Sequence, residues 1–197
     1  MKILSDIAAV HMGLTFRGSL KQAAAGAVAV VQMKDAGIGL LDSDQGLARI
    51  DGQVVAPRYL LQAGDLVFRS RGFDNSFSLV TARLGIAITI APMMFVRIHD
   101  PAQTLPDFLH WWLNRPATQK LIAERAQGGT IHMIPAGARG DLPVELPPIE
   151  RQGSIARIAG LSLKERNLAL AIADKRRALV DAQLHAAVLK RGGSHAH

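Results

Sequence analysis

Arginine and amide side chains gather in the middle of the sequence. Arg69, Arg71 and Asn75 lie within the run FRSRGFDNS. An arginine guanidinium can bond guanine O6 and N7 together, and an asparagine amide can bond adenine in the same two-point way. Because Arg69 and Arg71 are two residues apart, they share one face of a strand, and Gly72 after them permits a sharp turn. This spacing indicates side chains that can contact base edges or phosphates.

The same arginines also fit an exposed edge strand, on which charged side chains prevent pairing with other chains. Residue types alone leave both interpretations open. Two further loops, Thr15–Gly18 and Gln127–His132, combine glycine with polar residues. Glycine lets a backbone approach a ligand closely, but such loops also serve as ordinary connections between elements.

Catalytic patterns are missing from the sequence. It contains no cysteine, which excludes a disulfide framework, a thiol nucleophile and cysteine-based metal sites. It also lacks the GxxxxGK, GxGxxG and GxSxG patterns of phosphate loops, dinucleotide sites and nucleophile elbows. The histidines do not pair at metal-ligand spacing, apart from His195 and His197 near the end of the chain, which we interpret as incidental. No catalytic residue and no metal ligand is predicted, so the chain is not expected to be an enzyme.

The formal net charge of +7 is unevenly distributed. Residues 1–150 carry 14 Lys/Arg against 13 Asp/Glu, whereas residues 151–197 carry 9 against 3. The high pI of 10.4 therefore does not by itself establish nucleic-acid binding by the larger part. The apolar run between Arg83 and Arg97 is shorter than the roughly 20 residues of a membrane span. We expect a soluble cytoplasmic protein that makes no contact with a membrane.

Before residue 150, short runs of β-forming residues alternate with turn signals, which predicts a mixed α/β domain. The predicted strands are Val28–Met33, Gln53–Ala56, Leu66–Ser70, Ser78–Ala82, Gly85–Ile90 and Met94–Ile98. The predicted helices are Asp6–Val10, capped by Ser5, and Asp107–Ala126, which starts at Pro106 and is split or bent at Asn114-Arg115-Pro116. Trp111 and Trp112 are predicted to lie in the core.

A proline-rich connector, Leu142–Gln152, is predicted to be extended and to lead into one long helix. Apolar residues then recur in alternating steps of three and four, which is the pattern of a coiled coil. The seam residues are Ile158, Leu161, Leu168, Ile172, Leu179 and Leu189. A seam this long favours dimerisation, or docking on another subunit, over folding back on its own domain. The predicted organisation is a domain at 1–150, a spacing and dimerisation helix at 151–191, and a disordered tail at 192–197.

Six segments taken in order resemble one family. They are Ile7–Gly18 (IAAVHMGLTFRG), Val31–Asp35 (VQMKD), Leu61–Gly72 (LQAGDLVFRSRG), Leu105–Asn114 (LPDFLHWWLN), Gln127–Ile134 (QGGTIHMI) and Leu142–Gln152. The family is the DNA-specificity subunit of type I restriction–modification systems. The resemblance implies an α/β target-recognition domain followed by a long coiled-coil helix that acts as spacer and dimerisation rod. Family members usually carry two such domains and two helices, so this chain looks like a half-subunit or a piece of a longer protein.

The resemblance also implies a function. The chain would be the non-catalytic, sequence-specific DNA-recognition subunit, reading half of a bipartite double-stranded target, and two copies would pair their helices as a homodimer. A partner methyltransferase subunit would bind S-adenosylmethionine and methylate adenine, and a motor–nuclease subunit would cut unmodified DNA. The chain itself would need no cofactor. The alternatives are a stand-alone DNA-binding regulator and a protein–protein adaptor of related fold.

The hypothesis for the DNA contacts combines the matched segments with the chemistry of polar residues on predicted turns and strand ends. The candidate DNA-binding residues are Arg17, Lys34, Arg58, Arg69, Arg71, Asn75, Arg83 and His132.

Overall fold

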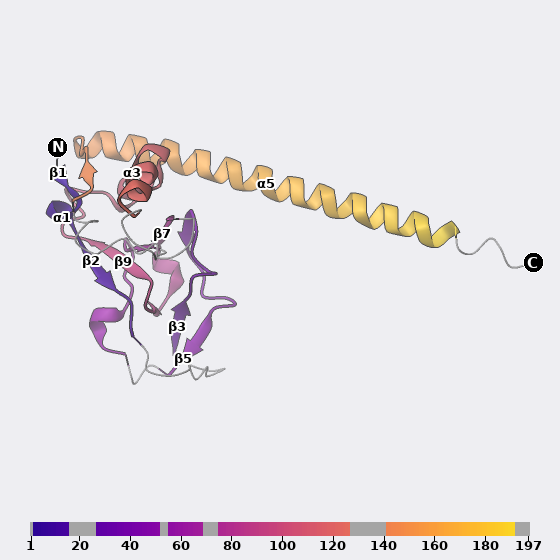
Figure 1. Ribbon diagram of the computed structural model, residues 1–197, viewed down its shortest axis with the longest axis horizontal. Helices are drawn as coiled ribbons and strands as arrows, with labels where there is room; N and C mark the ends of the chain where they lie inside the picture. Colours follow the sequence, from indigo (N-terminus) through magenta and orange to yellow (C-terminus); the bar gives the residue numbers. More distant parts are fainter. Residues whose placement is uncertain (1, 16–26, 52–54, 69–74, 127–140, 192–197) are drawn as a thin grey trace, which may run out of the picture. The chain divides into compact units, whose positions relative to one another are not determined.

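The computed structural model describes residues 2–15, 27–51, 55–68, 75–126 and 141–191 (Figure 1). The chain divides into two compact units, Met1–Ala156 and Arg157–His197. Helix α5 (Ile149–Arg191) contributes its first turns to the first unit and forms the described part of the second. The predicted α/β architecture with a long C-terminal helix is confirmed.

Three sheets build the first unit. The five-stranded sheet has the order β2 (Ala8–Met12), β9 (Met94–Ile98), β6 (Leu66–Phe68), β7 (Phe77–Val80) and β4 (Gly39–Leu41). The three-stranded sheet has the order β5 (Ala48–Ile50), β3 (Val28–Val31) and β8 (Ala87–Thr89). The two-stranded sheet joins β1 (Lys2–Ile3) to β10 (Pro143–Val144). The pairs β3–β8 and β4–β7 are parallel and the other pairs are antiparallel.

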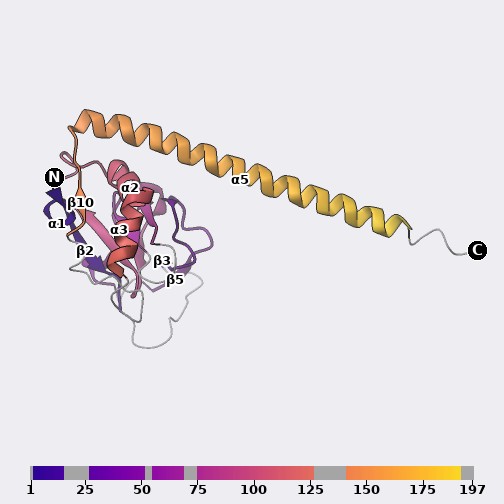
Figure 2. The ribbon, with the colours of Figure 1, turned by 45° about the horizontal axis from the view of Figure 1, so that its top comes forward.

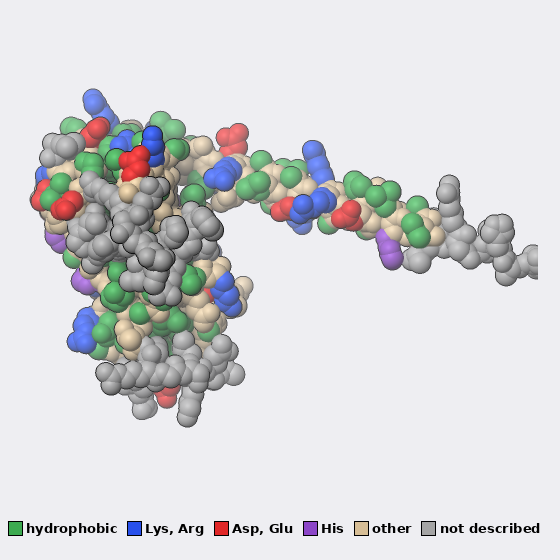
Figure 3. Space-filling view, in the orientation of Figure 1, with side chains coloured by type: hydrophobic (Ala, Val, Ile, Leu, Met, Phe, Trp, Pro, Cys, Tyr) green, Lys and Arg blue, Asp and Glu red, His purple; other side chains and the backbone are tan. Residues whose placement is uncertain are grey.

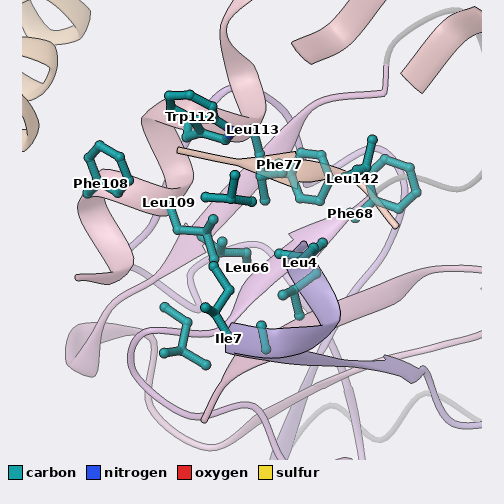
Figure 4. Packing of buried hydrophobic residues seen from close by; sticks show 14 of the residues in the cluster. Leu4, Ile7, Leu66, Phe68, Phe77, Phe108, Leu109, Trp112, Leu113 and Leu142 are labelled. Carbon is teal, nitrogen blue, oxygen red and sulfur yellow. The ribbon is translucent and has the colours of Figure 1, made fainter. Parts of the chain in front are cut away.

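The five-stranded sheet is buried on both faces because successive side chains on a strand point to opposite sides. Leu66 and Phe68 pack with the helices, whereas Val67 between them packs with residues of the three-stranded sheet. On the helical side lie α1 (Leu4–Ile7), α2 (Pro106–Asn114) and α3 (Pro116–Ala126) (Figures 1 and 2). Figure 4 shows side chains from α2, α1 and the sheet meeting in this core.

The predicted second helix is indeed split by proline. Helix α2 starts at Pro106, and α3 starts at Pro116 after Arg115 adopts an extended backbone. Trp112 is buried as predicted, while Trp111 is only half-buried against the core.

Three element predictions were wrong or displaced. Residues 8–10 were expected in a helix, but they belong to β2 because their backbone pairs along the full length of β9. The helix before them is the single turn α1, whose entry is fixed by the Asp6 carboxylate accepting the Ile3 N–H at 2.9 Å, with Ser5 inside the helix. The predicted connector is extended only as far as Pro148, because α5 already begins at Ile149.

The predicted strand Gln53–Ala56 falls partly outside the described residues. The strand in this region is β5, which comes earlier in the chain, at Ala48–Ile50. Val55 and Ala56 are not in a strand, and the short 3-10 helix η2 (Pro57–Tyr59) follows them.

The first turn of α5 is fastened to the rest of its unit by one buried amide. Gln152 is 1% exposed. Its Nε2 donates to the carbonyl oxygens of Gln103 and Pro147, both at 2.9 Å, and its Oε1 accepts the Leu105 N–H at 2.9 Å. Because Leu105 directly precedes α2, this side chain ties the start of α5 to the start of α2.

Asp65, just before β6, and Arg97, on the neighbouring strand β9, form an ion pair. Asp65 is 2% exposed, and the Arg97 side chain is 24% exposed. Arg97 donates from Nε to Oδ1 at 2.9 Å and from a terminal nitrogen to Oδ2 at 2.6 Å. The hydrogen bond to Asp65 raises the pKa of the Arg97 guanidinium above its usual value. Arg97 also donates to the Leu60 carbonyl at 2.8 Å, so it links β9 to the chain that precedes β6.

Gly13 lies where β2 leaves the five-stranded sheet and meets the end of β8. A Cβ atom there would lie 2.8 Å from backbone atoms of Thr89 and Ile90. We expect Gly13→Ala to lower the free energy of unfolding by about 1–3 kcal/mol, as overpacking does. Urea denaturation measures the change. Gly37→Ala is the matched control, because a Cβ at Gly37 meets nothing within 4 Å; an equal loss in both variants would contradict the steric explanation.

Among the described residues, no helix is long and apolar enough to cross a membrane. The same part of the chain holds no group of three or more His, Cys, Asp or Glu side chains that could bind a metal ion.

Candidate nucleic-acid interface

One end of the five-stranded sheet is marked by a row of paired residues. The cross-strand partners are Met12 with Met94, Met94 with Phe68, and Phe68 with Phe77. These four residues therefore lie side by side on β2, β9, β6 and β7. We call this edge the loop end of the sheet.

The strand ends at the loop end adjoin, in the sequence, segments that hold several of the candidate DNA-binding residues. The segment leaving β2 after Met12 leads toward Arg17, and the connection from Phe68 to Phe77 includes Arg69, Arg71 and Asn75. The turn from β3 to β4 also enters here, because Gly39 pairs with Ser78 beside Phe77. Sequence segments far apart are thus brought to one side of the domain by strand register alone.

Lys34 is exposed within the β3–β4 turn. The turn is held by the Asp35 carboxylate, which accepts the Gln32 N–H at 2.9 Å, and by the Asp35 N–H, which donates to the Gln32 carbonyl at 3.0 Å. On its β4 side, the Ser78 hydroxyl donates to the Gly37 carbonyl at 2.6 Å. The ammonium of Lys34 is therefore carried on a fixed backbone.

The stem of the Phe68–Phe77 connection is clamped by the corner between α2 and α3. Asn114 accepts the Phe77 N–H through Oδ1 and donates to the Phe77 carbonyl through Nδ2, both at 2.9 Å. Gln119 donates through Nε2 to the Asn75 carbonyl at 3.2 Å and to the Leu113 carbonyl at 2.7 Å. The side chains of α2 and α3 thus satisfy backbone groups just before β7. A rigid stem is what a base-reading loop needs, because base contacts require accurate placement.

His110 completes this clamp from within α2. Its Nε2 lies 3.0 Å from the Phe77 carbonyl oxygen, and the side chain is buried. Burial lowers the pKa of His110 below its ordinary value near 6.5, and the hydrogen bond to Phe77 opposes that effect without cancelling it. The imidazole is therefore neutral at pH 7 and donates its Nε2 proton to the carbonyl.

This histidine should make stability depend on pH. Since its folded pKa lies below its unfolded value, the unfolded chain binds more protons, and the free energy of unfolding falls as the pH drops below about 6.5. Between pH 7 and pH 5, one proton changes the free energy of unfolding by at most about 1.4 kcal/mol per pH unit. We expect His110→Gln, which keeps a hydrogen-bond donor, to flatten the slope of the unfolding free energy against pH in this range. Urea titrations of both proteins across that range measure it. Parallel slopes would contradict the assignment.

Two described candidates lie away from the loop end. Arg83 is in the 3-10 helix η3 (Ala82–Leu84), just after Thr81, whose N–H donates to the Leu41 carbonyl at the opposite end of the β4–β7 pair. Arg58 is in η2, beside the Leu60–Ile88 bridge on the β8 edge of the three-stranded sheet. Its guanidinium lies over the Tyr59 ring, 4.8 Å from the centroid. Strand pairing does not bring either arginine to the loop end.

The other candidates divide as follows. Asn75 is described and half-buried, with its carbonyl engaged by Gln119. Arg17, Arg69, Arg71 and His132 lie outside the described residues. Sequence reasoning did not find Asn114, Gln119 and His110, which hold the stem. Their only sequence signal was the Asn114-Arg115-Pro116 helix break, which marks a corner without showing what the corner contacts.

The predicted seam residues of α5 are exposed in the isolated chain. Ile158, Leu161, Leu168, Ile172 and Leu179 have between 51% and 66% of their surface exposed. The side chain of Leu189 lies outside the described residues. Figure 3 shows apolar side chains along the visible face of this helix, interspersed with basic and acidic ones. An exposed apolar surface of this kind is typical of a helix that packs against a partner, because packing removes the apolar side chains from water.

A second apolar stripe runs along α5, and sequence reasoning missed it. Leu170, Val180 and Leu184 are 54%, 51% and 62% exposed. Because each helical residue turns by about 100°, Leu170 lies about 200° around the axis from Leu168. The helix therefore presents apolar side chains on two nearly opposite faces. A search for one heptad seam cannot reveal this, because Arg177 interrupts the second stripe between Leu170 and Val180.

Comparison with solved structures identifies the class of fold. A chain from a structure titled for complex assembly and conformational transition of the type I R-M system matches 96% of this chain, with 17% identity and a TM-score of 0.67. The HsdS subunit from Thermoanaerobacter tengcongensis matches 87%, with 15% identity and a TM-score of 0.59. The type I restriction–modification S subunit from M. genitalium matches 93%, with 14% identity and a TM-score of 0.58.

The chain thus has the fold of type I restriction–modification specificity subunits, as its sequence segments predicted. It spans 38–44% of the length of these three structures. No protein-family model matches the sequence, and no curated protein does.

Proposed function

We propose that the chain is the sequence-specific DNA-recognition subunit of a type I restriction–modification system. The observation that carries the proposal is the structural match over 96% of the chain to a chain of such a system. The matched region contains one domain and one long helix, so one chain would read one half of a bipartite target. The chain itself would be non-catalytic and would need no cofactor.

The loop end of the sheet would face the DNA. Lys34 on its fixed turn and the clamped stem before β7 lie at this edge, and the sequence places Arg69 and Arg71 between Phe68 and Phe77, which both end here. Lysine suits phosphate contact, whereas arginine and asparagine suit base edges. Arg17 and His132 remain candidates from the sequence, whereas Arg58 and Arg83, which lie away from the loop end, would not read bases.

The two apolar stripes of α5 would serve two partners. We assign the predicted seam, called the Leu168 stripe after one of its residues, to a second copy of the chain. The two helices would pair antiparallel, and the dimer would carry two DNA-recognition domains. We assign the Leu170 stripe to a methyltransferase subunit, which would bind S-adenosylmethionine and modify adenine. A motor–nuclease subunit would join the same complex. The 43 residues of α5 would then form a rod of about 65 Å.

The proposal is tested by DNA selection with the assembled methyltransferase complex. A random double-stranded library yields the preferred target, and binding of each single-base variant of that target is then measured by fluorescence anisotropy. We expect Arg69→Ala and Arg71→Ala each to relax discrimination at one base position by about 1–3 kcal/mol, or roughly 5-fold to 150-fold. Lys34→Ala should weaken binding to all DNA sequences alike and reduce the salt dependence of that binding.

Arg83→Ala is the matched control, because Arg83 lies at the opposite end of the β4–β7 pair. It should leave base discrimination unchanged. If Arg69→Ala and Arg71→Ala leave both affinity and discrimination intact, the loop end is not the reading surface. If no DNA sequence is enriched and binding hardly changes with salt, the chain is a protein–protein adaptor. Tight specific binding by the chain alone would instead indicate a stand-alone regulator.

A further inference from the structure

A groove of about 870 Å³ opens on the first unit, beside α2. Its walls come from three places: α2 and Arg115 after it, the connector Glu145–Pro148, and the first turns of α5 at Arg151 and Ile155. Lys2 of β1 also lines it. We call it the connector groove. None of the four candidate DNA-binding residues that the structure describes lines it.

The apolar surface of the connector groove is fixed in place. Trp111 is half-buried and packs against Phe108, with ring centroids 5.8 Å apart. The neighbouring Trp112 donates its Nε1 proton to the Pro143 carbonyl at 3.3 Å. On the connector side, the Pro147 carbonyl accepts Nε2 of buried Gln152. An aromatic and proline-lined surface held by such bonds can receive a side chain without first reorganising.

The charges around the connector groove are mostly positive. Among the described residues that line it, Lys2, Arg115 and Arg151 are basic and one, Glu145, is acidic. Arg115 is positioned rather than free: its guanidinium carbon lies 3.2 Å from the Trp112 ring centroid, and its Nε donates to the Thr118 hydroxyl at 2.9 Å. The stacking and the hydrogen bond hold the guanidinium in one position. The groove therefore combines an apolar surface with a cationic rim.

We propose that the connector groove binds an extended acidic segment of a partner protein. A large apolar side chain of that segment would lie against Trp111 and Pro147, and flanking carboxylates would meet Arg115 and Arg151. Charge complementarity selects an acidic segment, because three cations face one carboxylate. The apolar lining favours a peptide over nucleic acid, since duplex DNA would have to unstack a base to reach Trp111, whereas a peptide side chain reaches it directly. This surface extends the proposed function and does not depend on DNA recognition.

The test uses the full-length chain and a display library of random twelve-residue peptides. Peptides selected on the parent protein are counter-selected on Arg151→Glu, and the most enriched peptide is measured by fluorescence polarisation. We expect enriched sequences to combine Asp or Glu with one large apolar residue. Arg151→Glu and Trp111→Ala should each weaken that peptide at least tenfold. Arg157→Glu, the same charge reversal six residues further along α5 and outside the groove, should change affinity less than twofold.

The salt dependence of binding separates the contribution of the charges from the contribution of the apolar surface. Raising the salt concentration should weaken binding by the parent protein and leave the residual affinity of Arg151→Glu nearly constant. Because Arg151 is exposed, its substitution tests the groove even if Trp111→Ala perturbs folding. The proposal is overturned if enriched peptides are not acidic, or if Arg151→Glu and Arg157→Glu behave alike. It is also overturned if single-stranded dT12 binds more tightly than the peptide and loses affinity in Trp111→Ala, which would make the groove a nucleic-acid site.

Discussion

Aspartate at both Leu168 and Leu179 should convert a dimer of this chain into a monomer. Both leucines are more than half exposed in the isolated chain, at 55% and 59%, and both belong to the stripe that we assign to a second copy. Burying one leucine contributes about 1.5–3 kcal/mol. A two-fold interface uses each residue twice, so four leucine contacts are lost and four charges are placed in apolar surroundings. We expect the dissociation constant to rise at least about 1,000-fold.

Size exclusion with light scattering measures this directly, since a monomer has a mass of 21.1 kDa and a dimer twice that. The matched control is Leu170→Asp with Leu184→Asp, which places the same charges on the other stripe. The control variant should remain a dimer but should no longer bind the methyltransferase subunit. If both double variants stay dimeric, the Leu168 stripe is not the dimer interface. If the parent chain is monomeric at every concentration and in the complex, the half-subunit organisation is wrong.

Asp65→Ala should be strongly destabilising. It removes both carboxylate oxygens that bind Arg97 and leaves a guanidinium, three-quarters buried, without its counter-ion. It also removes the acceptor of the Gln62 N–H, which donates to Asp65 Oδ2 at 2.8 Å. Stranding one partner of a buried pair costs about 3–5 kcal/mol. Urea denaturation at pH 7 should show a loss of this size.

The double variant Asp65→Ala with Arg97→Met tests the cause. With both charges removed, the desolvation penalty disappears, and we expect the double variant to recover part of the lost stability. Arg97→Met alone should cost at least as much as Asp65→Ala, because it leaves the Asp65 carboxylate, which is 2% exposed, with the Gln62 N–H as a donor but without a counter-ion. If the double variant is less stable than Asp65→Ala, the stranded charge is not the cause, and the Arg97 bond to the Leu60 carbonyl would account for the loss instead.

The sequence allowed the local elements to be predicted where one signal dominated. Met94–Ile98 was predicted to the residue, and Pro116 correctly marked the break between α2 and α3. Ala8–Val10 was missed because alanine favours a helix in isolation, while pairing with β9 decides the strand. Tertiary contacts overrode local preference there. The fold class followed from the ordered segments, which the structural matches later confirmed.

The candidate site was predictable by residue type and much less by position. Register decides which candidates share an edge, and nothing in the local sequence shows that Lys34 lies at the loop end and Arg83 at the other. The clamp by Asn114 and Gln119 acts across 37 and 44 residues of chain. Contacts of that span depend on the packing of α2 on the sheet, which no short pattern encodes.

The pairing of the first residues with the connector has a consequence for how the protein is made. Lys2 pairs with Val144, and the Leu4 N–H donates to the Leu142 carbonyl at 2.8 Å. A chain emerging from the ribosome cannot complete this sheet until residue 144 is available. Contacts of such long sequence separation slow folding and leave apolar surface exposed while the chain is incomplete. Leu4 and Ile7, buried in the finished core, are made well before residue 144 and would stay partly uncovered until it is available, so chaperones should engage this segment during synthesis.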